Sequence, residues 1–416
     1  MNVKLCKFFL LMIILYSGLY MNFFQSIPNM MSMLGICMLI FLLFSVMITS
    51  AKINYFINSE IIIWIIFGFI CLFTAMFTAS NLYYATTNLF KYFQNIMLIV
   101  TICYISKYDG KCDFIINIYY FYTLLFAIVI LVNGYDINGR IEFINMSANS
   151  IGITMFLGTF CVLYKANFKH IIKTIISIAS ICLFGFVIIL TGSRKALIAF
   201  FVCIIYWIVF CLKKYTITLS VYKKFTAMLV VISMIFAVTI ELKPVFKESN
   251  MYDRIVGEDK TAQVSDEIRK DMYKDAMQYF ESSPVFGIGY KNYELVSKFK
   301  TYTHSTYAEL LACTGIIGFL MYNLSLLIAL IKTIIIITDK NLDFENKNKA
   351  KLMLIMLSIM IFLGFGVIHF YDIHSSIVFG MIFGFTLVNS KSWRKNKNEQ
   401  NEVFFKFIFK KSYGYS

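Results

Sequence analysis

A histidine and a glutamate lie five residues apart where a polar stretch gives way to a long apolar one. The segment HSTYAELLACTGIIG places His304 in the polar part and Glu309 just inside the apolar part, with Tyr307 between them. A neutral imidazole titrates near neutral pH and is suited to take a proton from a hydroxyl. A carboxylate inside a membrane span is costly unless it has a partner or lines a cavity. His304 is therefore a candidate general base and Glu309 a weaker acidic helper. The alternative for His304 is an interfacial aromatic or a helix cap satisfied by water.

Arginine is rare in this chain, which has 33 lysines and five arginines. The planar guanidinium binds phosphate or carboxylate through two hydrogen bonds, which lysine cannot do. The best candidate is Arg194, followed by Lys195, because a charge in a short turn at a membrane end is costly without a partner. The alternative for any one arginine is an ordinary surface ion pair with Asp253 or Asp266. Four arginines fall in segments that we place on the outer side of a membrane below: Arg140, Arg194, Arg254 and Arg269.

The segment HFYDIH, residues 369–374, holds two histidines and an aspartate. These residue types suit zinc, but their spacing matches no metal motif, so we predict no metal site here. Asp372 and His374 are instead candidates for contacts with a ligand, and ordinary interface residues are the alternative.

The composition of the chain shows what kind of protein must position these residues. With 416 residues, 59% of them hydrophobic, and a mean hydropathy of +0.74, the chain is too apolar for a soluble domain. A membrane-spanning helix needs about 20 apolar residues. We therefore predict an all-α polytopic membrane protein with about twelve transmembrane helices, at residues 8–26, 30–50, 59–80, 90–106, 114–133, 147–165, 171–191, 195–212, 225–242, 306–337, 352–370 and 374–390.

The distribution of lysines predicts the orientation. Lysines concentrate in every second connection, such as residues 107–111 and 340–351, and in the basic tail 391–416. Because cytoplasmic loops carry the excess of Lys and Arg, we place both termini in the cytoplasm. The formal charge of +15 then matches anionic lipid headgroups, and no nucleic-acid motif accompanies it. The predicted regions are helices one to nine in 1–242, a long outer loop in 243–304, helices ten to twelve in 305–390, and the tail.

The outer loop 243–304 contains a predicted amphipathic helix and a turn. Apolar residues recur every three to four positions from Val264 to Phe280, and Pro284 ends the pattern. The following Gly-Ile-Gly at 287–289 is typical of a tight turn, and Tyr290 directly after it is a candidate ligand contact. Loops of this length are usually functional.

Three motifs resemble one family. HSTYAELLACTGIIG resembles a His-Asn/Ser-x-x-Leu-Glu stretch followed by Gly-x-x-Gly. RKDMYKDAMQYFESSPVFGIG resembles an Arg, an aromatic-alanine helix and a Pro-x-x-Gly-x-Gly turn, and TGSRKALIAF resembles a Ser-Arg turn ahead of a span. Together, over residues 190–320, they are similar to the bacterial O-antigen ligase and Wzy-type polysaccharide polymerase superfamily.

The resemblance implies a GT-C-like membrane glycosyltransferase that acts on sugars carried by undecaprenyl diphosphate, at the outer face of the bacterial cytoplasmic membrane. By motif match, Arg194 and Arg269 hold the diphosphate and His304 is the base on the acceptor hydroxyl. The transfer inverts the anomeric centre and needs no cofactor or metal. A chain-length regulator and a flippase of the same pathway are candidate partners. Further expected contacts with diphosphate or glycan are Arg254, Lys195, Tyr290, Tyr307, Asp372 and His374.

Several function classes stay open. A polymerase is favoured over a ligase because Ser305 stands where Asn is common in ligases. A transporter or lipid flippase also has about twelve spans, but residues 1–200 and 201–416 show no repeat of the kind that transporters often have. A sensor or structural membrane protein would not need the arginines and the histidine.

Overall fold

The computed structural model describes residues 2–17, 33, 37, 58–133, 141, 146–166, 171–211, 251–252 and 260–390. The predicted span 30–50, apart from residues 33 and 37, the predicted span 225–242 and the basic tail lie outside the described residues. So do Arg140 and Arg254, and so does most of the segment 243–259.

The elements of the described part are helices. Five of them, α4, α5, α6, α8 and α16, are long and apolar enough to cross a membrane. This confirms a helical, multi-pass membrane protein, while the total of twelve spans stays a prediction. The α-helices are α1 Asn2–Leu15, α4 Ser59–Phe77, α5 Leu82–Asp109, α6 Asp113–Val132, α7 Ala148–Lys165, α8 Ile171–Thr191, α9 Arg194–Cys211, α14 Lys260–Ser282, α15 Tyr293–Val296, α16 Thr306–Thr338, α17 Phe344–Leu363 and α18 Ile373–Asn389, with a 3₁₀ turn, η3, at His369–Tyr371.

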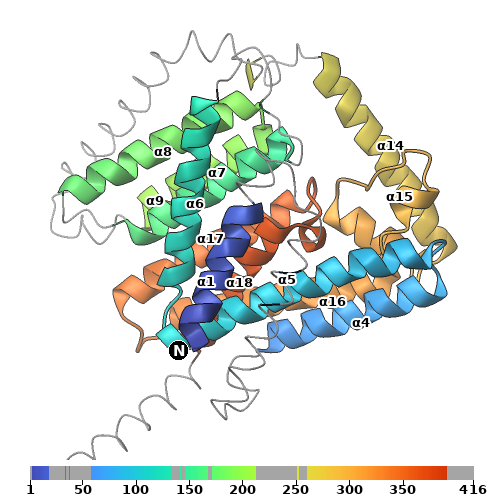
Figure 1. Ribbon diagram of the computed structural model, residues 1–416, viewed down its shortest axis with the longest axis horizontal. Coiled ribbons are helices and arrows are strands. Elements are labelled where there is room, and N and C mark those ends of the chain that lie inside the picture. The colour runs from blue at the N-terminus through green and yellow to red at the C-terminus, as the bar shows by residue number, and fades with distance from the viewer. Residues whose placement is uncertain are drawn as a thin grey trace, which may run out of the picture.

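The helices form two groups that meet at the centre of the molecule (Figure 1). In the first group α4 packs on both α5 and α16, and α18 packs on α5. In the second group α7 packs on α6, α8 and α9. Helix α17 joins the groups because it contacts α16 on one side and α9 on the other. Helix α14 lies outside both groups and packs on α16.

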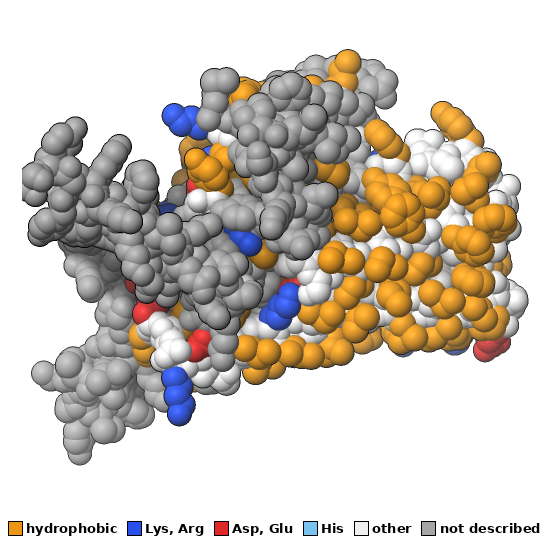
Figure 2. Space-filling model, turned by 90° about the horizontal axis from the view of Figure 1, so that it is seen from below, with side chains coloured by type: hydrophobic (Ala, Val, Ile, Leu, Met, Phe, Trp, Pro, Cys, Tyr) orange, Lys and Arg blue, Asp and Glu red, His pale blue; other side chains and the backbone are white. Residues whose placement is uncertain are grey.

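One face of the first group is covered by apolar side chains (Figure 2). Successive turns of α4 expose residues such as Ile62, Phe69 and Phe77, and the second half of α16 exposes residues such as Leu327 and Ile331. A contiguous apolar surface of this extent is unusual for a soluble protein and is expected where a helix faces lipid.

Helix α16 is broken at Gly315, and the loop after α14 fills the break. Gly315 has φ 62° and ψ −166°. The N–H of Ile316 donates to the carbonyl of Pro284 at 2.9 Å, and the N–H of Ile288 donates to the carbonyl of Ala312 at 2.9 Å. A Cβ at position 315 would lie 2.3 Å from the carbonyl oxygen of Val285. Glycine is therefore required, because no other residue allows this backbone conformation and this close approach.

The connections predicted on the outer side gather at one end of the bundle. The hydroxyl of Ser80, after α4, donates to the side-chain oxygen of Asn292 at 2.6 Å. The N–H of Thr306, at the start of α16, donates to the carbonyl of Gly364 at 2.8 Å. The structure thus assembles segments 79–80, 283–306 and 364–372 into one region. Which side of the membrane this region faces stays a prediction.

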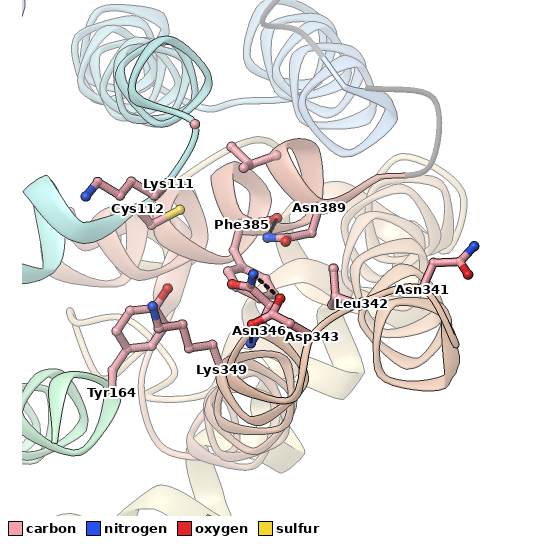
Figure 3. A pocket seen from close by; sticks show the side chains of 12 residues that line it. Lys111, Cys112, Tyr164, Asn341, Leu342, Asp343, Asn346, Lys349, Phe385 and Asn389 are labelled. Atoms are coloured by element: carbon pink, nitrogen blue, oxygen red, sulfur yellow. Dashed lines mark hydrogen bonds between the residues drawn. The ribbon is translucent and has the colours of Figure 1, made fainter. Parts of the chain in front are cut away.

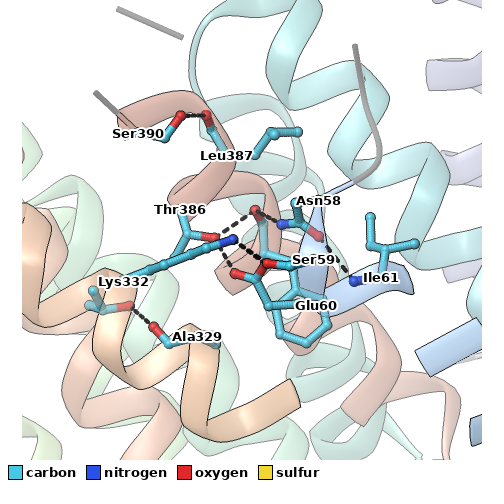
Figure 4. Close-up of polar contacts among 11 residues, drawn as sticks. Asn58, Ser59, Glu60, Ile61, Ala329, Lys332, Thr386, Leu387 and Ser390 are labelled. Atoms are coloured by element: carbon cyan, nitrogen blue, oxygen red, sulfur yellow. Dashed lines mark hydrogen bonds and ion pairs between the residues drawn. The ribbon is translucent and has the colours of Figure 1, made fainter. Parts of the chain in front are cut away.

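At the opposite end of α4, a buried carboxylate joins three helices (Figure 4). Glu60 of α4 has no exposed surface. One of its oxygens accepts from the ammonium of Lys332 on α16 and the other accepts from the hydroxyl of Thr386 on α18, at 3.1 Å. Burying a carboxylate is costly unless it is hydrogen-bonded or paired with a cation, and Glu60 has both kinds of partner. The cluster therefore fixes α4, α16 and α18 relative to one another.

Candidate functional site

A cavity of about 340 Å³ lies between the turn before α9 and one face of α14. We call it the cation pocket, because four basic side chains and one carboxylate line it. Its basic residues come from two places in the chain, the start of α9 and the middle of α14. The cation pocket is lined by Asn149, Gly192, Arg194, Lys195, Asp266, Arg269, Lys270 and Tyr273.

The local sequence explains why these side chains share one cavity. Gly192 has φ 62° and ends α8, so that α9 begins two residues later with Arg194 at its first position. On α14, residues three and four apart lie on the same face. Asp266, Arg269 and Tyr273 have this spacing, and together they form the opposite wall of the pocket.

Asp266 pairs with both predicted diphosphate-binding arginines. Its Oδ2 lies 2.7 Å from Nη2 of Arg194, and its Oδ1 lies 3.6 Å from Nη1 of Arg269. The alternative expected from the sequence, an ion pair with Asp266, is therefore confirmed for Arg194 and Arg269. One carboxylate still leaves the pocket with an excess of positive charge, because Lys195 and Lys270 also line it.

The connection between α17 and η3 contacts two residues that line the pocket, Lys195 and Tyr273. A Cβ on Gly366 would lie 1.5 Å from the Nζ of Lys195, so this ammonium lies directly against the Gly366 backbone. The hydroxyl of Tyr273 donates to the carbonyl of Phe365 at 2.9 Å. Helices α9 and α14 therefore meet the 364–367 turn, which also holds the start of α16.

His304 lies within electrostatic reach of the cation pocket. Burial, and then the positive charges of Arg269 and Lys195, lower the pKa of His304 to about 4. The imidazole is therefore neutral at neutral pH, which is the form that accepts a proton. Its ring centroid lies 4.5 Å from that of Tyr302. The charges of Arg269 and Lys195 thus act on His304, which does not itself line the cation pocket.

Glu309 is placed differently from His304. It has no exposed surface, and its two oxygens accept from the backbone N–H of Thr303 at 3.0 Å and from the hydroxyl of Tyr371 at 3.1 Å. The thiol of Cys313 lies 3.6 Å from the second oxygen. The carboxylate is held among protein donors and is not part of the lining of the cation pocket.

Two predicted contact residues, Tyr290 and Tyr307, do not line the cation pocket. Tyr290 is buried, and its ring packs against Tyr371 with 5.5 Å between centroids. The hydroxyl of Tyr307 donates to the carbonyl of Ile361 at 2.6 Å. Tyr307 therefore packs the start of α16 against the end of α17, whereas Tyr290 packs between α5 and η3.

Two of the three polar side chains of the HFYDIH segment, His369 and Asp372, meet at the hydroxyl of Ser375, at 3.0 and 2.7 Å, and the third, His374, contacts Tyr119. Asp372 caps α18 by accepting from the backbone N–H of Ser375 at 2.7 Å. The Nδ1 of His374 lies 3.2 Å from the hydroxyl of Tyr119, whereas the Nε2 of His369 lies 2.7 Å from the carbonyl of Met360. Neither Asp372 nor His374 lines the cation pocket. Within the described part of the chain, no group of three or more His, Cys, Asp or Glu is placed to hold a metal ion.

A second cavity, of about 330 Å³, lies at the other end of α7 (Figure 3). Asn149 lines the cation pocket and Tyr164 lines this one, which separates the two by about 22 Å along the helix axis. Its wall includes Asp343, Lys349 and Asn389. None of the predicted site residues lies in it.

The three motif regions meet in the structure. A comparison with known protein families matches a stretch of the chain that contains all three. Residues 178–323 match the family model of O-antigen ligases. The match confirms the predicted resemblance to the O-antigen ligase and Wzy-type superfamily. The O-antigen ligase match supports a polymerase- or ligase-type function in O-antigen biosynthesis, and with the spanning helices it points to a multi-pass bacterial membrane enzyme. A search of curated proteins finds no match.

The O-antigen ligase match includes Arg194, Lys195, Arg269 and His304, and also residues that sequence reasoning did not select. Lys270 and Tyr273 could have been found from their spacing relative to Arg269 on a helix. Asn149, which precedes the matched segment, and Gly366, which follows it, carry no such signal. They come near the pocket only because α7 and the 364–367 turn fold against α9 and α14.

Proposed function

We propose that this chain is a membrane glycosyltransferase that joins glycan repeat units carried on undecaprenyl diphosphate, with His304 as the base. The observation that carries the proposal is the proximity of His304 to a pocket with four cations and one carboxylate. The diphosphate is the negatively charged part of such a donor, and the cations of the pocket would neutralise its charge. The match to O-antigen ligases supports a polymerase- or ligase-type reaction in O-antigen biosynthesis.

In this proposal Arg194 and Arg269 bind the diphosphate of the donor. Each charge-assisted hydrogen bond to a phosphate oxygen contributes about 1.5–3 kcal/mol. Because negative charge grows on the diphosphate as the glycosidic bond breaks, cations that already surround it stabilise the transition state more than the ground state. Lys195, held against the Gly366 backbone, contributes a further fixed charge.

The transfer is a single displacement at the anomeric carbon. The acceptor hydroxyl oxygen forms the new bond to that carbon while its proton passes to the neutral imidazole of His304. The bond between the anomeric carbon and the diphosphate oxygen breaks, and undecaprenyl diphosphate leaves with the bonding electrons. Attack opposite the leaving group inverts the anomeric centre.

Donor binding adjusts His304 for this role. The charges of Arg269 and Lys195 contribute to the lowered pKa of His304, which makes the imidazole a weak base. A bound diphosphate offsets these charges, so the pKa of His304 rises when the donor is present. The imidazole then accepts the acceptor proton more readily, at the stage of the cycle when the acceptor hydroxyl attacks.

Polymerisation is the first candidate reaction, and transfer of a finished glycan to another acceptor is the second, favoured by the description of the matched family. Both reactions use the same donor chemistry and the same pocket. We place the site on the outer face of the bacterial cytoplasmic membrane with both termini inside, and a chain-length regulator and flippase as partners of the same pathway.

Glycan gels from cells test the proposal. A deletion strain should show one repeat unit on the acceptor if the chain is a polymerase, and long chains left on undecaprenyl carriers if it is a ligase. Genes encoding Arg269→Ala and His304→Ala should fail to restore the normal pattern, whereas Lys274→Ala should restore it. Lys274 is the matched control because it is a cation on the same helix, it pairs with Asp271 at 3.6 Å, and it does not line the pocket. Normal glycans with the first two variants would overturn the proposal and favour a transporter.

A further inference from the structure

His304 has a backbone conformation that needs support. Its φ is 58°, in the left-handed region that residues other than glycine seldom adopt because it is strained. The next residue, Ser305, is the N-cap of α16. His304 therefore occupies the last position of a turn. Helix α16 fixes the residue after His304, so the residue before it must be held by another contact.

Glu309 holds the turn through Thr303, the residue before His304. The N–H of Thr303 donates to Oε2 of Glu309 at 3.0 Å, and both residues are fully buried. The Thr303 hydroxyl donates to the carbonyl of Ser305 at 2.9 Å and also lies 3.3 Å from the Ser305 N–H. The residues on both sides of His304, Thr303 and Ser305, are thus hydrogen-bonded to each other, and Thr303 is also hydrogen-bonded to Glu309.

The other oxygen of Glu309 is fixed by a separate segment. Oε1 accepts from the hydroxyl of Tyr371 at 3.1 Å, and the thiol of Cys313 lies 3.6 Å away. The ammonium of Lys291 lies 4.5 Å from the centre of the Tyr371 ring, which holds that ring in place. The donors that contact Glu309 are an amide, a hydroxyl and a thiol, all of them neutral groups.

From these contacts we propose that Glu309 is a positioning residue: it accepts hydrogen bonds that keep the 303–305 turn, and thus the His304 ring, in place, and it exchanges no proton with substrate. This inference rests on the proposed function of His304 and adds a role that is distinct from that of a catalytic carboxylate. A positioning role requires an acceptor oxygen at this site but does not require a negative charge. Glutamine supplies that oxygen, and its NH₂ group can donate to the Tyr371 hydroxyl oxygen in turn.

Two variants of Glu309 separate the roles. Glu309→Gln should keep kcat within about 3-fold of the wild type, because the Thr303 N–H retains its acceptor. Glu309→Met has a similar length but no acceptor, so the turn relaxes and His304 moves. A displacement of about 1 Å lowers kcat by about 100-fold, while the KM for the donor stays within about 2-fold because the cation pocket is intact. Both values are measured with purified protein and a lipid-linked repeat unit.

A third variant tests the same turn without touching the glutamate. Thr303→Val removes the hydroxyl that bridges to Ser305 and retains the backbone N–H. It should lower kcat by about 10-fold with unchanged donor KM, and it carries the test if Glu309→Met does not fold. Glu60→Gln is the matched control, because Glu60 is an equally buried carboxylate at the far end of the bundle. It should affect thermal stability without a selective loss of kcat.

The outcomes separate this inference from the proposed function. If His304→Ala retains activity, the proposed function fails. If His304→Ala is inactive and Glu309→Gln is as inactive as Glu309→Met, the function stands and the positioning role is overturned, because the negative charge would then be required. An unchanged kcat in both Glu309→Met and Thr303→Val would also overturn it.

Discussion

Asp266 lies between Arg194 and Arg269 and pairs with both, with N–O distances of 2.7 and 3.6 Å. Arg194 begins α9, and Arg269 lies in α14, 75 positions later in the chain. This one carboxylate therefore links two helices that are far apart in the sequence. Its side chain is 43% exposed, and an ion pair of this kind contributes at most about 1 kcal/mol. Because the ion pairs are this weak, a diphosphate can compete with Asp266 for both arginines.

Replacing this carboxylate should not harm donor binding. In Asp266→Asn the amide keeps the shape of the side chain and removes the one negative charge of the cation pocket. We expect the KM for the lipid-linked donor to fall by about 2–5-fold, from the loss of a repulsion of about 1 kcal/mol in water. Initial rates at varied donor concentration measure this. A loss of activity by 10-fold or more would mean that Asp266 acts on the substrate itself.

Removing Arg269 should have the opposite effect. Arg269→Ala deletes one charge-assisted contact to the diphosphate, so kcat/KM should fall by about 10–150-fold. Arg269→Lys should recover part of this loss, because an ammonium supplies the charge but not the two-pronged hydrogen bonding. Lys274→Ala serves as the control on the same helix. Equal activity of Arg269→Ala and Lys274→Ala would show that the pocket does not bind the donor.

The pH dependence should differ between the free enzyme and the donor complex. Protonation of His304 abolishes its function as a base, so activity falls as the pH drops through its pKa. In the free enzyme this pKa is lowered to about 4, which sets the acidic limb of kcat/KM. The bound diphosphate offsets Arg269 and Lys195, so the acidic limb of kcat should lie at higher pH. A limb of kcat at the same or lower pH would contradict the arrangement of charges.

The break in α16 should be sensitive to a single methyl group. Gly315→Ala places a Cβ 2.3 Å from the Val285 carbonyl oxygen and forces alanine to φ 62°. We expect a loss of about 2–4 kcal/mol in stability from strain and overpacking, seen as a lower Tm in detergent. Gly185→Ala in α8 is the control, because its new Cβ would meet only the side-chain ring of Phe200, at 3.0 Å. Equal Tm values for the two variants would contradict the close approach.

The sequence was sufficient to select the two arginines of the cation pocket and the histidine on which the charges of Arg269 and Lys195 act. Arg194 and Arg269 stood out because arginine is rare in this chain, and His304 stood out because it borders a span. Their proximity depends on α9, α14 and the start of α16 meeting at one end of the bundle. The alternation of spans predicts that meeting, since each of these segments was assigned to the same side.

Other features could not be predicted from the sequence because they depend on which way a side chain faces. Tyr290 follows a turn rich in glycine, and nothing in its neighbours shows that its ring packs inward against Tyr371. The break at Gly315 lies within an unbroken apolar stretch, so hydrophobicity alone predicts a continuous helix. Only the backbone hydrogen bonds to residues 284–289 explain why the helix is interrupted there.

The most direct test of the account is elongation of a purified lipid-linked repeat unit by the reconstituted protein, with and without the His304 imidazole. We predict that the wild-type protein converts the substrate to longer glycans and releases undecaprenyl diphosphate. His304→Ala should do so at least about 100-fold more slowly, as expected for loss of a general base. Elongation by His304→Ala at the wild-type rate would contradict the assignment of this site.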